Sequence, residues 1–103
     1  MANETQLDIR VESTDPLMIQ SIETALQSLK PTRQEPHRDL ITILTVTASA
    51  LNLAKSLIEL WKEIKSLRDA PTVKVEAESG AQLNLSTVKS EDEIQKFVTQ
   101  NSE

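Results

Sequence analysis

One histidine and several closely spaced carboxylates are the groups in this sequence that could support acid–base catalysis or metal binding. His37 lies between Glu35 and Asp39, and an imidazole beside carboxylates is found in both kinds of site. A catalytic histidine must be held rigidly, whereas His37 lies in a polar stretch that contains two prolines. We therefore expect His37 to be a solvated loop residue.

The paired carboxylates each have a simpler structural explanation. Glu59 and Glu63 share one helix face that also carries lysines, as on an ordinary solvated surface. The acidic run over residues 91–93 lies at an expected helix N-terminus, where the helix dipole stabilises negative charge. The chain has no cysteine and only one glycine, which excludes thiolate chemistry and glycine-rich phosphate loops. We predict a non-enzymatic protein with no catalytic, cofactor or metal site.

Length and composition predict one domain over residues 1–103, with an ordered core at about 5–99 and a frayed tail at 100–103. Hydrophobic residues make up 38% of the chain and aromatic residues 2%, so the core must be aliphatic. The net charge of -5 argues against nucleic acid as a partner. The first residues lack the basic and apolar pattern of a signal peptide, so we expect a cytoplasmic protein.

The N-terminal third predicts a strand followed by a helix. Leu7, Ile9 and Val11 alternate with polar residues, which is typical of a strand with one wet face. Asp15 and the proline after it form a helix start, and apolar residues then recur at helical spacing. Residues 31–38 show no apolar periodicity, and we expect them to form an exposed loop.

The middle of the chain carries an unusually regular apolar pattern. Three- and four-residue steps connect Ile43, Val46, Ala50, Leu53, Leu57, Leu60, Ile64 and Leu67. This spacing is that of a heptad repeat, and a second apolar stripe runs beside it. It predicts one helix over residues 40–68, about 45 Å long. The alternative is a strand over residues 40–47, because threonine and isoleucine favour strands and short apolar runs fit either structure.

The C-terminal third predicts a β-hairpin and a short helix. A three-residue loop over residues 78–80 pairs Val75 with Leu83 and puts Gly80 where the backbone φ angle is positive. Ser90 with Glu93 forms a capping box that starts the last helix. The complete prediction is an α+β fold of β-α-α-β-β-α order, with a three-stranded sheet packed against one long central helix and a shorter helix.

The two apolar stripes on the long helix leave two interpretations open. The sheet and the first helix together cover both stripes in a monomer, or part of the surface packs on another chain, because three strands are too narrow to cover so long a helix. We favour association and expect a homo-oligomer. The predicted interface consists of Ile43, Leu44, Val46, Ala50, Leu51, Leu53, Ala54, Leu57, Ile58 and Trp61.

Several motifs in the second half of the chain resemble a known family. They are the Leu-rich stretch of residues 57–62 ending in Trp and Lys, the Val-x-Val strand at 73–76, the turn at Gly80, the Leu-x-Leu strand at 83–85 and the Ser-x-x-Glu start at Ser90. In order and length the chain resembles the effector-associated constant component family, small proteins of prokaryotic conflict systems. The resemblance is concentrated in residues 50–98, and its motifs are structural.

This resemblance implies an accessory or adaptor subunit, because members of the family are encoded beside effectors such as trypsin-like or caspase-like proteases. We therefore expect a non-enzymatic adaptor of a defence or signalling system that self-associates and binds an effector. The alternative is a membrane-associating or pore-forming protein that uses the uncharged residues 40–54. That stretch is short for a membrane span and contains several threonine and serine residues, which weighs against the alternative.

Overall fold

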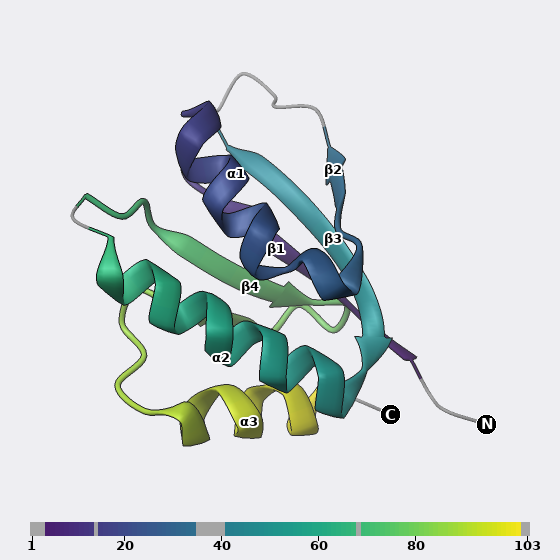
Figure 1. Ribbon diagram of the computed structural model, residues 1–103. Helices are drawn as coiled ribbons and strands as arrows, with labels where there is room; N and C mark the ends of the chain where they lie inside the picture. Colours follow the sequence, from purple (N-terminus) through teal and green to yellow (C-terminus); the bar gives the residue numbers. More distant parts are fainter. Residues whose placement is uncertain (1–3, 14, 35–40, 68, 102–103) are drawn as a thin grey trace.

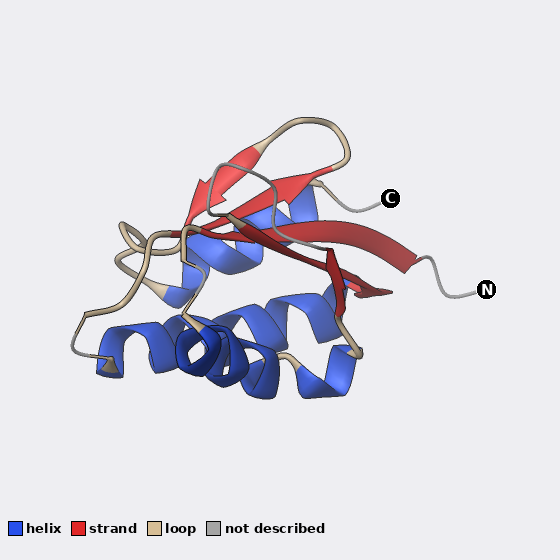
Figure 2. Ribbon diagram, turned by 90° about the horizontal axis from the view of Figure 1, so that it is seen from above, coloured by secondary structure: helices blue, strands red, loops and turns tan. Residues whose placement is uncertain are grey.

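Helices cover one face of an antiparallel sheet, and the opposite face carries none of the described helices (Figures 1 and 2). The computed structural model describes residues 4–13, 15–34, 41–67 and 69–101. Along the chain the elements are β1 (Glu4–Val11), α1 (Pro16–Ala25), the 3-10 helix η1 (Gln27–Leu29), β2 (Thr32–Gln34), β3 (Thr42–Ser49), α2 (Ala50–Ser66), β4 (Val73–Ala77), β5 (Gln82–Asn84) and α3 (Glu91–Gln100). The five strands lie in the order β2-β3-β1-β4-β5, with β1 in the centre.

The predicted α+β class is confirmed, but the three-stranded sheet and the element order are wrong. The observed α/β order, setting η1 aside, is β-α-β-β-α-β-β-α. β2 lies inside the stretch predicted to be a loop, and its three side chains are indeed exposed. It was missed because three polar residues carry no apolar alternation, and only the pairing with β3 makes them a strand.

The first half of the predicted long helix is a strand, so the 40–68 helix is wrong and the strand alternative holds for this part. β3 pairs with β1 along its whole length, from Glu4 opposite Ser49 to Val11 opposite Thr42. Thr42, Leu44 and Val46 are buried while the residues between them face outward, which is the period of a strand. The uncharged run fits both structures locally, and the neighbouring strand decides between them.

α2 begins directly where β3 ends. The Ser49 side chain accepts a hydrogen bond of 3.4 Å from the Asn52 N–H and caps the helix. The helix ends at Ser66, five residues before Pro71. β3 and α2 together therefore occupy the stretch in which the apolar spacing predicts one helix.

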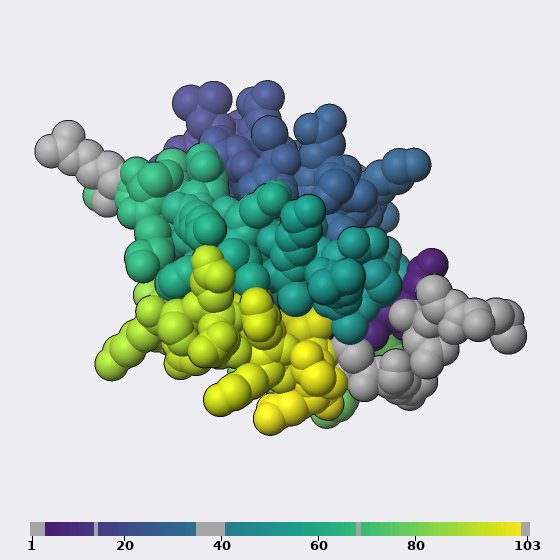
Figure 3. Space-filling view, turned by 60° about the horizontal axis from the view of Figure 1, so that its bottom comes forward, coloured from purple at the N-terminus to yellow at the C-terminus, as the bar shows by residue number. Residues whose placement is uncertain are grey.

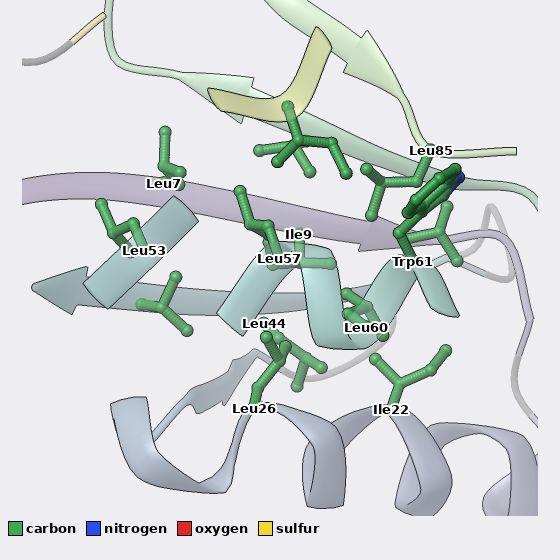
Figure 4. Packing of buried hydrophobic residues seen from close by; sticks show 14 of the residues in the cluster. Leu7, Ile9, Ile22, Leu26, Leu44, Leu53, Leu57, Leu60, Trp61 and Leu85 are labelled. Carbon is green, nitrogen blue, oxygen red and sulfur yellow. The ribbon is translucent and has the colours of Figure 1, made fainter. Parts of the chain in front are cut away.

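The core lies between the inner face of the sheet and the three helices. Figure 4 shows Leu53, Leu57 and Leu60 of α2 beside Leu7 and Ile9 of β1, with Ile22 of α1 and Leu26 at its C-cap below them. The fully buried large side chains are Leu7, Ile9, Val11, Ile22, Leu26, Leu44, Val46, Leu53, Leu57, Leu60, Leu85 and Ile94. Burial of each such side chain contributes about 1.5–3 kcal/mol relative to an exposed position. The core is aliphatic, as the composition requires.

The hairpin between β4 and β5 has the register that its loop length predicts. Val75 lies opposite Leu83, and the Ala77 N–H donates to the Ala81 carbonyl at 2.8 Å across the loop. Gly80 has a φ of 95°, in the left-handed region that residues with a Cβ rarely adopt. The hairpin places β5 at the edge of the sheet, next to β4, and β4 pairs on its other side with β1.

Candidate interaction site

The ten residues of the predicted interface separate into three groups in the structure. Leu44, Val46, Leu53, Leu57 and Trp61 are buried in the core; Ala50, Leu51, Ala54 and Ile58 lie on the outer part of α2; Ile43 lies half-buried on the helix-free face of the sheet. The first five are core residues rather than surface residues, which corrects the prediction for them. The reason is that β3 belongs to the sheet, and the sheet packs against the apolar stripe of α2. The sequence prediction assigns this role to a second chain.

A shallow groove runs between α2 and α3. Figure 3 shows the two helices side by side on the surface, with α1 on the other side of α2. The groove has a volume of about 530 Å³ and is lined by Ala50, Leu51, Ala54, Lys55, Ile58, Gln95 and Thr99. Leu51 is 80% exposed and stands at the rim of the groove. Isolated exposed leucines are common, but this one adjoins other apolar side chains in a hollow, as in a docking site.

The helical repeat of α2 explains why apolar side chains remain outside. Leu53, Leu57 and Leu60 form the stripe that packs on the sheet. Ala54 and Ile58 come one position later along the chain, which turns them about 100° away on the helix and toward α3. The outer stripe is therefore the remainder of the wide apolar surface that the sequence predicts for this region.

The groove contrasts electrostatically with the rest of the chain. Lys55 is the charged residue among the described residues that line it, and none of these is a carboxylate although the chain has a net charge of -5. One turn past Ile58, Lys62 forms an ion pair of 3.2 Å with Glu91 and connects α2 to the start of α3. Both side chains of that pair are largely exposed, so it contributes little to stability.

The helix-free face of the sheet is a second surface, which the sequence prediction of three strands does not include. Its side chains form rows across the strands. Asp8 lies directly opposite Glu76, and these two residues are called the acidic row. Two residues further along the strands, Arg10 lies directly opposite Lys74, and these are called the basic row. The signal in the sequence is the alternation in β1 and β4, but only the register between the strands reveals the rows.

Hydrogen bonds connect side chains on this face across the strands. Gln34 donates to the Thr45 hydroxyl at 3.1 Å, and that hydroxyl donates to the Asp8 carboxylate at 2.9 Å. Toward the β5 edge of the same face, Gln82 donates to the Glu76 carboxylate at 2.8 Å. Two diagonal ion pairs join Arg10 to Glu76 at 3.6 Å and Lys74 to Glu12 at 3.7 Å. These contacts link the side chains of both rows to neighbouring strands.

Among the carboxylates that the sequence places in closely spaced groups, Glu93 has a structural role in the described residues. The Glu93 carboxylate accepts the backbone N–H groups of Lys89, at 2.6 Å, and Ser90, at 3.1 Å, as the capping box predicts. These two bonds hold the pKa of Glu93 below its ordinary value. His37 and its neighbours Glu35 and Asp39 lie outside the described residues. Among the described residues, no three histidine, cysteine, aspartate or glutamate side chains gather as a metal site would need.

None of the helices in the described part of the chain has the length and apolar character needed to span a membrane. Residues 42–49 of the uncharged stretch form a strand, and Leu44 and Val46 within it are buried.

Comparisons with protein-family models, with curated proteins and with solved structures give no match to this chain.

Proposed function

We propose that this chain is a non-enzymatic adaptor of a prokaryotic conflict or signalling system, which self-associates in the cytoplasm and binds an effector through the groove between α2 and α3. The exposure of Leu51 beside the apolar floor of that groove is the observation that carries the proposal. The sequence resemblance to the effector-associated constant component family supplies the class of partner, a trypsin-like or caspase-like protease.

The groove suits a protein segment better than a small polar ligand. Ala50, Ala54 and Ile58 offer apolar area, while Gln95 and Thr99 on the α3 side offer side-chain hydrogen bonds along the rim. Burying the exposed part of Leu51 against a partner contributes about 1.5–3 kcal/mol, which is the size of a modest hot-spot residue. Lys55 at the rim favours a partner segment that carries a carboxylate beside its apolar residues.

The membrane alternative depends on a helix over the uncharged residues 40–54, and most of this stretch is a strand. It requires the uncharged half of a long helix to present apolar side chains to lipid. Residues 42–49 are instead a strand whose apolar side chains Leu44 and Val46 face the core. We therefore favour the adaptor.

Two charge substitutions of exposed leucines test the adaptor proposal. Leu51→Glu places a carboxylate at the groove, whereas Leu17→Glu is a matched control because Leu17 is 73% exposed on α1. The partner to test is a purified trypsin-like or caspase-like protease from the same genome, the class that the resemblance implies, and binding is measured by isothermal titration calorimetry. We expect Leu51→Glu to weaken binding by about tenfold or more and Leu17→Glu to leave it unchanged. Equal binding by both variants and the wild type rejects the groove as the binding site.

A further inference from the structure

We propose that the helix-free face of the sheet is a self-complementary surface on which two copies of this chain pack face to face. Four charged residues in the middle of this face are sorted into rows of one sign, with Asp8 and Glu76 in the acidic row and Arg10 and Lys74 in the basic row. The proposal gives the self-association part of the proposed function a surface of its own, and it does not depend on the groove.

The sorting of charges by row is unusual for a face that only meets water. Like charges directly opposite each other on neighbouring strands are destabilising, and an antiparallel pair gains from opposite charges at such positions. Here an acid faces an acid and, two residues further on, a base faces a base. Exchanging Asp8 with Arg10 on β1 would place opposite charges directly across from each other on β1 and β4. In the observed arrangement, opposite charges meet only through the diagonal ion pairs of Arg10 with Glu76 and of Lys74 with Glu12. Local rules are most often broken where a function requires it.

A two-fold axis between the two rows converts this arrangement into complementarity. The axis lies between two facing sheets, perpendicular to the strands, and each strand then lies over the same strand of the second copy. Asp8 meets Arg10 of the second copy, and Glu76 meets Lys74 of the second copy. Because two-fold contacts are reciprocal, each pair occurs twice. The uncharged residues of the same rows also meet uncharged residues, since Thr45 lies over Ile43 and Gln82 over Asn84 of the second copy.

Charge complementarity also excludes the other simple two-fold arrangement. An axis parallel to the strands, between β1 and β4, would place Asp8 over Glu76 and Arg10 over Lys74 of the second copy, so that every charged contact would join like charges. Facing sheets cross at about 30° because each is twisted. β1 is the central strand, so its Asp8 and Arg10 lie near the pivot of that rotation and keep their partners.

The resulting dimer would have four layers, with the helices of both copies on the outside (Figure 2). The groove between α2 and α3 lies in the helical layer, so both grooves stay accessible and face away from each other. Such a dimer presents two effector sites at once, which raises the avidity for a multimeric or clustered effector.

Charge reversal on β1 provides the test, because it predicts both loss and rescue. Arg10→Asp makes both β1 positions acidic and Asp8→Arg makes both basic, so each variant repels its own copy. Mixed together, the two variants restore both opposite-charge pairs in a heterodimer. The double variant with both changes restores the pairs in a homodimer and also pairs the charges within each chain. Lys96→Glu on α3 is the control, since Lys96 is exposed in the helical layer.

Molar mass is measured by sedimentation equilibrium and light scattering, and folding is checked by circular dichroism. We expect a wild-type dimer of the 11.5 kDa chain that weakens with added salt. Each single reversal should weaken it by about tenfold or more, while the mixture, the double variant and Lys96→Glu should remain dimeric.

Three outcomes would overturn the sheet-face dimer: a wild-type chain that stays monomeric at high micromolar concentration, single variants that dimerise as well as wild type, or a mixture that forms no heterodimer. A dimer dissociated by Leu51→Glu but not by Arg10→Asp assigns self-association to the groove instead. Effector binding by a monomeric wild type that is lost in Leu51→Glu leaves the proposed adaptor function standing and rejects the sheet-face dimer alone.

Discussion

The indole Nε1 of Trp61 donates a hydrogen bond of 3.2 Å to the backbone carbonyl of Val88. This bond joins α2 to the segment that leads into α3, and Trp61 is only 6% exposed. On the solvent side of the ring, the Lys65 ammonium group lies 4.4 Å from the ring centroid. Trp61 is thus a core residue that connects α2 to the segment preceding α3.

Trp61→Phe tests the contribution of this hydrogen bond. Phenylalanine keeps an aromatic ring in the core but leaves the Val88 carbonyl without its indole donor. An unsatisfied buried acceptor costs about 1–3 kcal/mol, and the smaller ring adds a packing loss. The free energy of unfolding in urea, followed by circular dichroism, should fall by at least that amount. Lys65→Ala is the comparison and should cost less, about 0.5–1 kcal/mol for an exposed cation–π contact. A smaller loss for Trp61→Phe than for Lys65→Ala would contradict this assignment.

Gly80 should tolerate asparagine better than valine. A Cβ added at Gly80 has nothing within 4 Å, so a substitution meets backbone strain at the φ of 95° rather than a clash. Gly80→Val should lower the free energy of unfolding by more than about 1 kcal/mol, because β-branched residues are poorly tolerated at positive φ. Gly80→Asn should lose less, since asparagine visits this region more readily. Thermal unfolding of the two variants decides the matter, and equal melting temperatures would speak against the turn geometry.

Two neighbouring residues on β3 should differ strongly in how much stability their substitution costs. Leu44 is fully buried, and Leu44→Ala should cost about 2–5 kcal/mol. Ile43 is half-buried on the outward face beside Arg10, so Ile43→Thr should cost less, about 1 kcal/mol or below. Urea unfolding at equal protein concentration measures both. A larger loss at Ile43 than at Leu44 is incompatible with the observed strand register.

The lowered pKa of Glu93 predicts a loss of stability in acid. A carboxylate whose pKa is lower in the folded than in the unfolded state stabilises the fold at pH values above its unfolded pKa. This contribution disappears as the pH falls through the folded pKa, because the carboxylate that accepts the Lys89 and Ser90 N–H groups becomes protonated. The stability advantage of the wild type over Glu93→Gln should therefore be present at pH 7 and shrink in acid. An advantage of the same size at pH 7 and in acid would contradict the capping role of the charge. An NMR titration of the Glu93 carboxyl measures its pKa directly.

The β1 strand, the hairpin and the last helix could be predicted from the sequence because their signals are local. The alternation of Leu7, Ile9 and Val11 requires one buried strand face wherever the strand pairs. Gly80 and the Ser90–Glu93 capping box fix a turn and a helix start through interactions within a few residues. The absence of cysteine and the scarcity of aromatic residues likewise fix the aliphatic character of the core.

The tertiary structure alone decided the secondary structure of residues 42–49 and the placement of the candidate sites. An uncharged run of threonine, isoleucine, leucine and valine satisfies both helical and strand periodicity over so short a length. The apolar inner face of β1 selects the strand, since β3 pairs with it along all eight residues. Leu44 and Val46 are buried in the observed fold, and Leu51 is exposed. A continuous helix would have placed all three on its two neighbouring apolar stripes. Only the register of β1 with β4, set by contacts distant in sequence, brings Asp8 opposite Glu76 and Arg10 opposite Lys74.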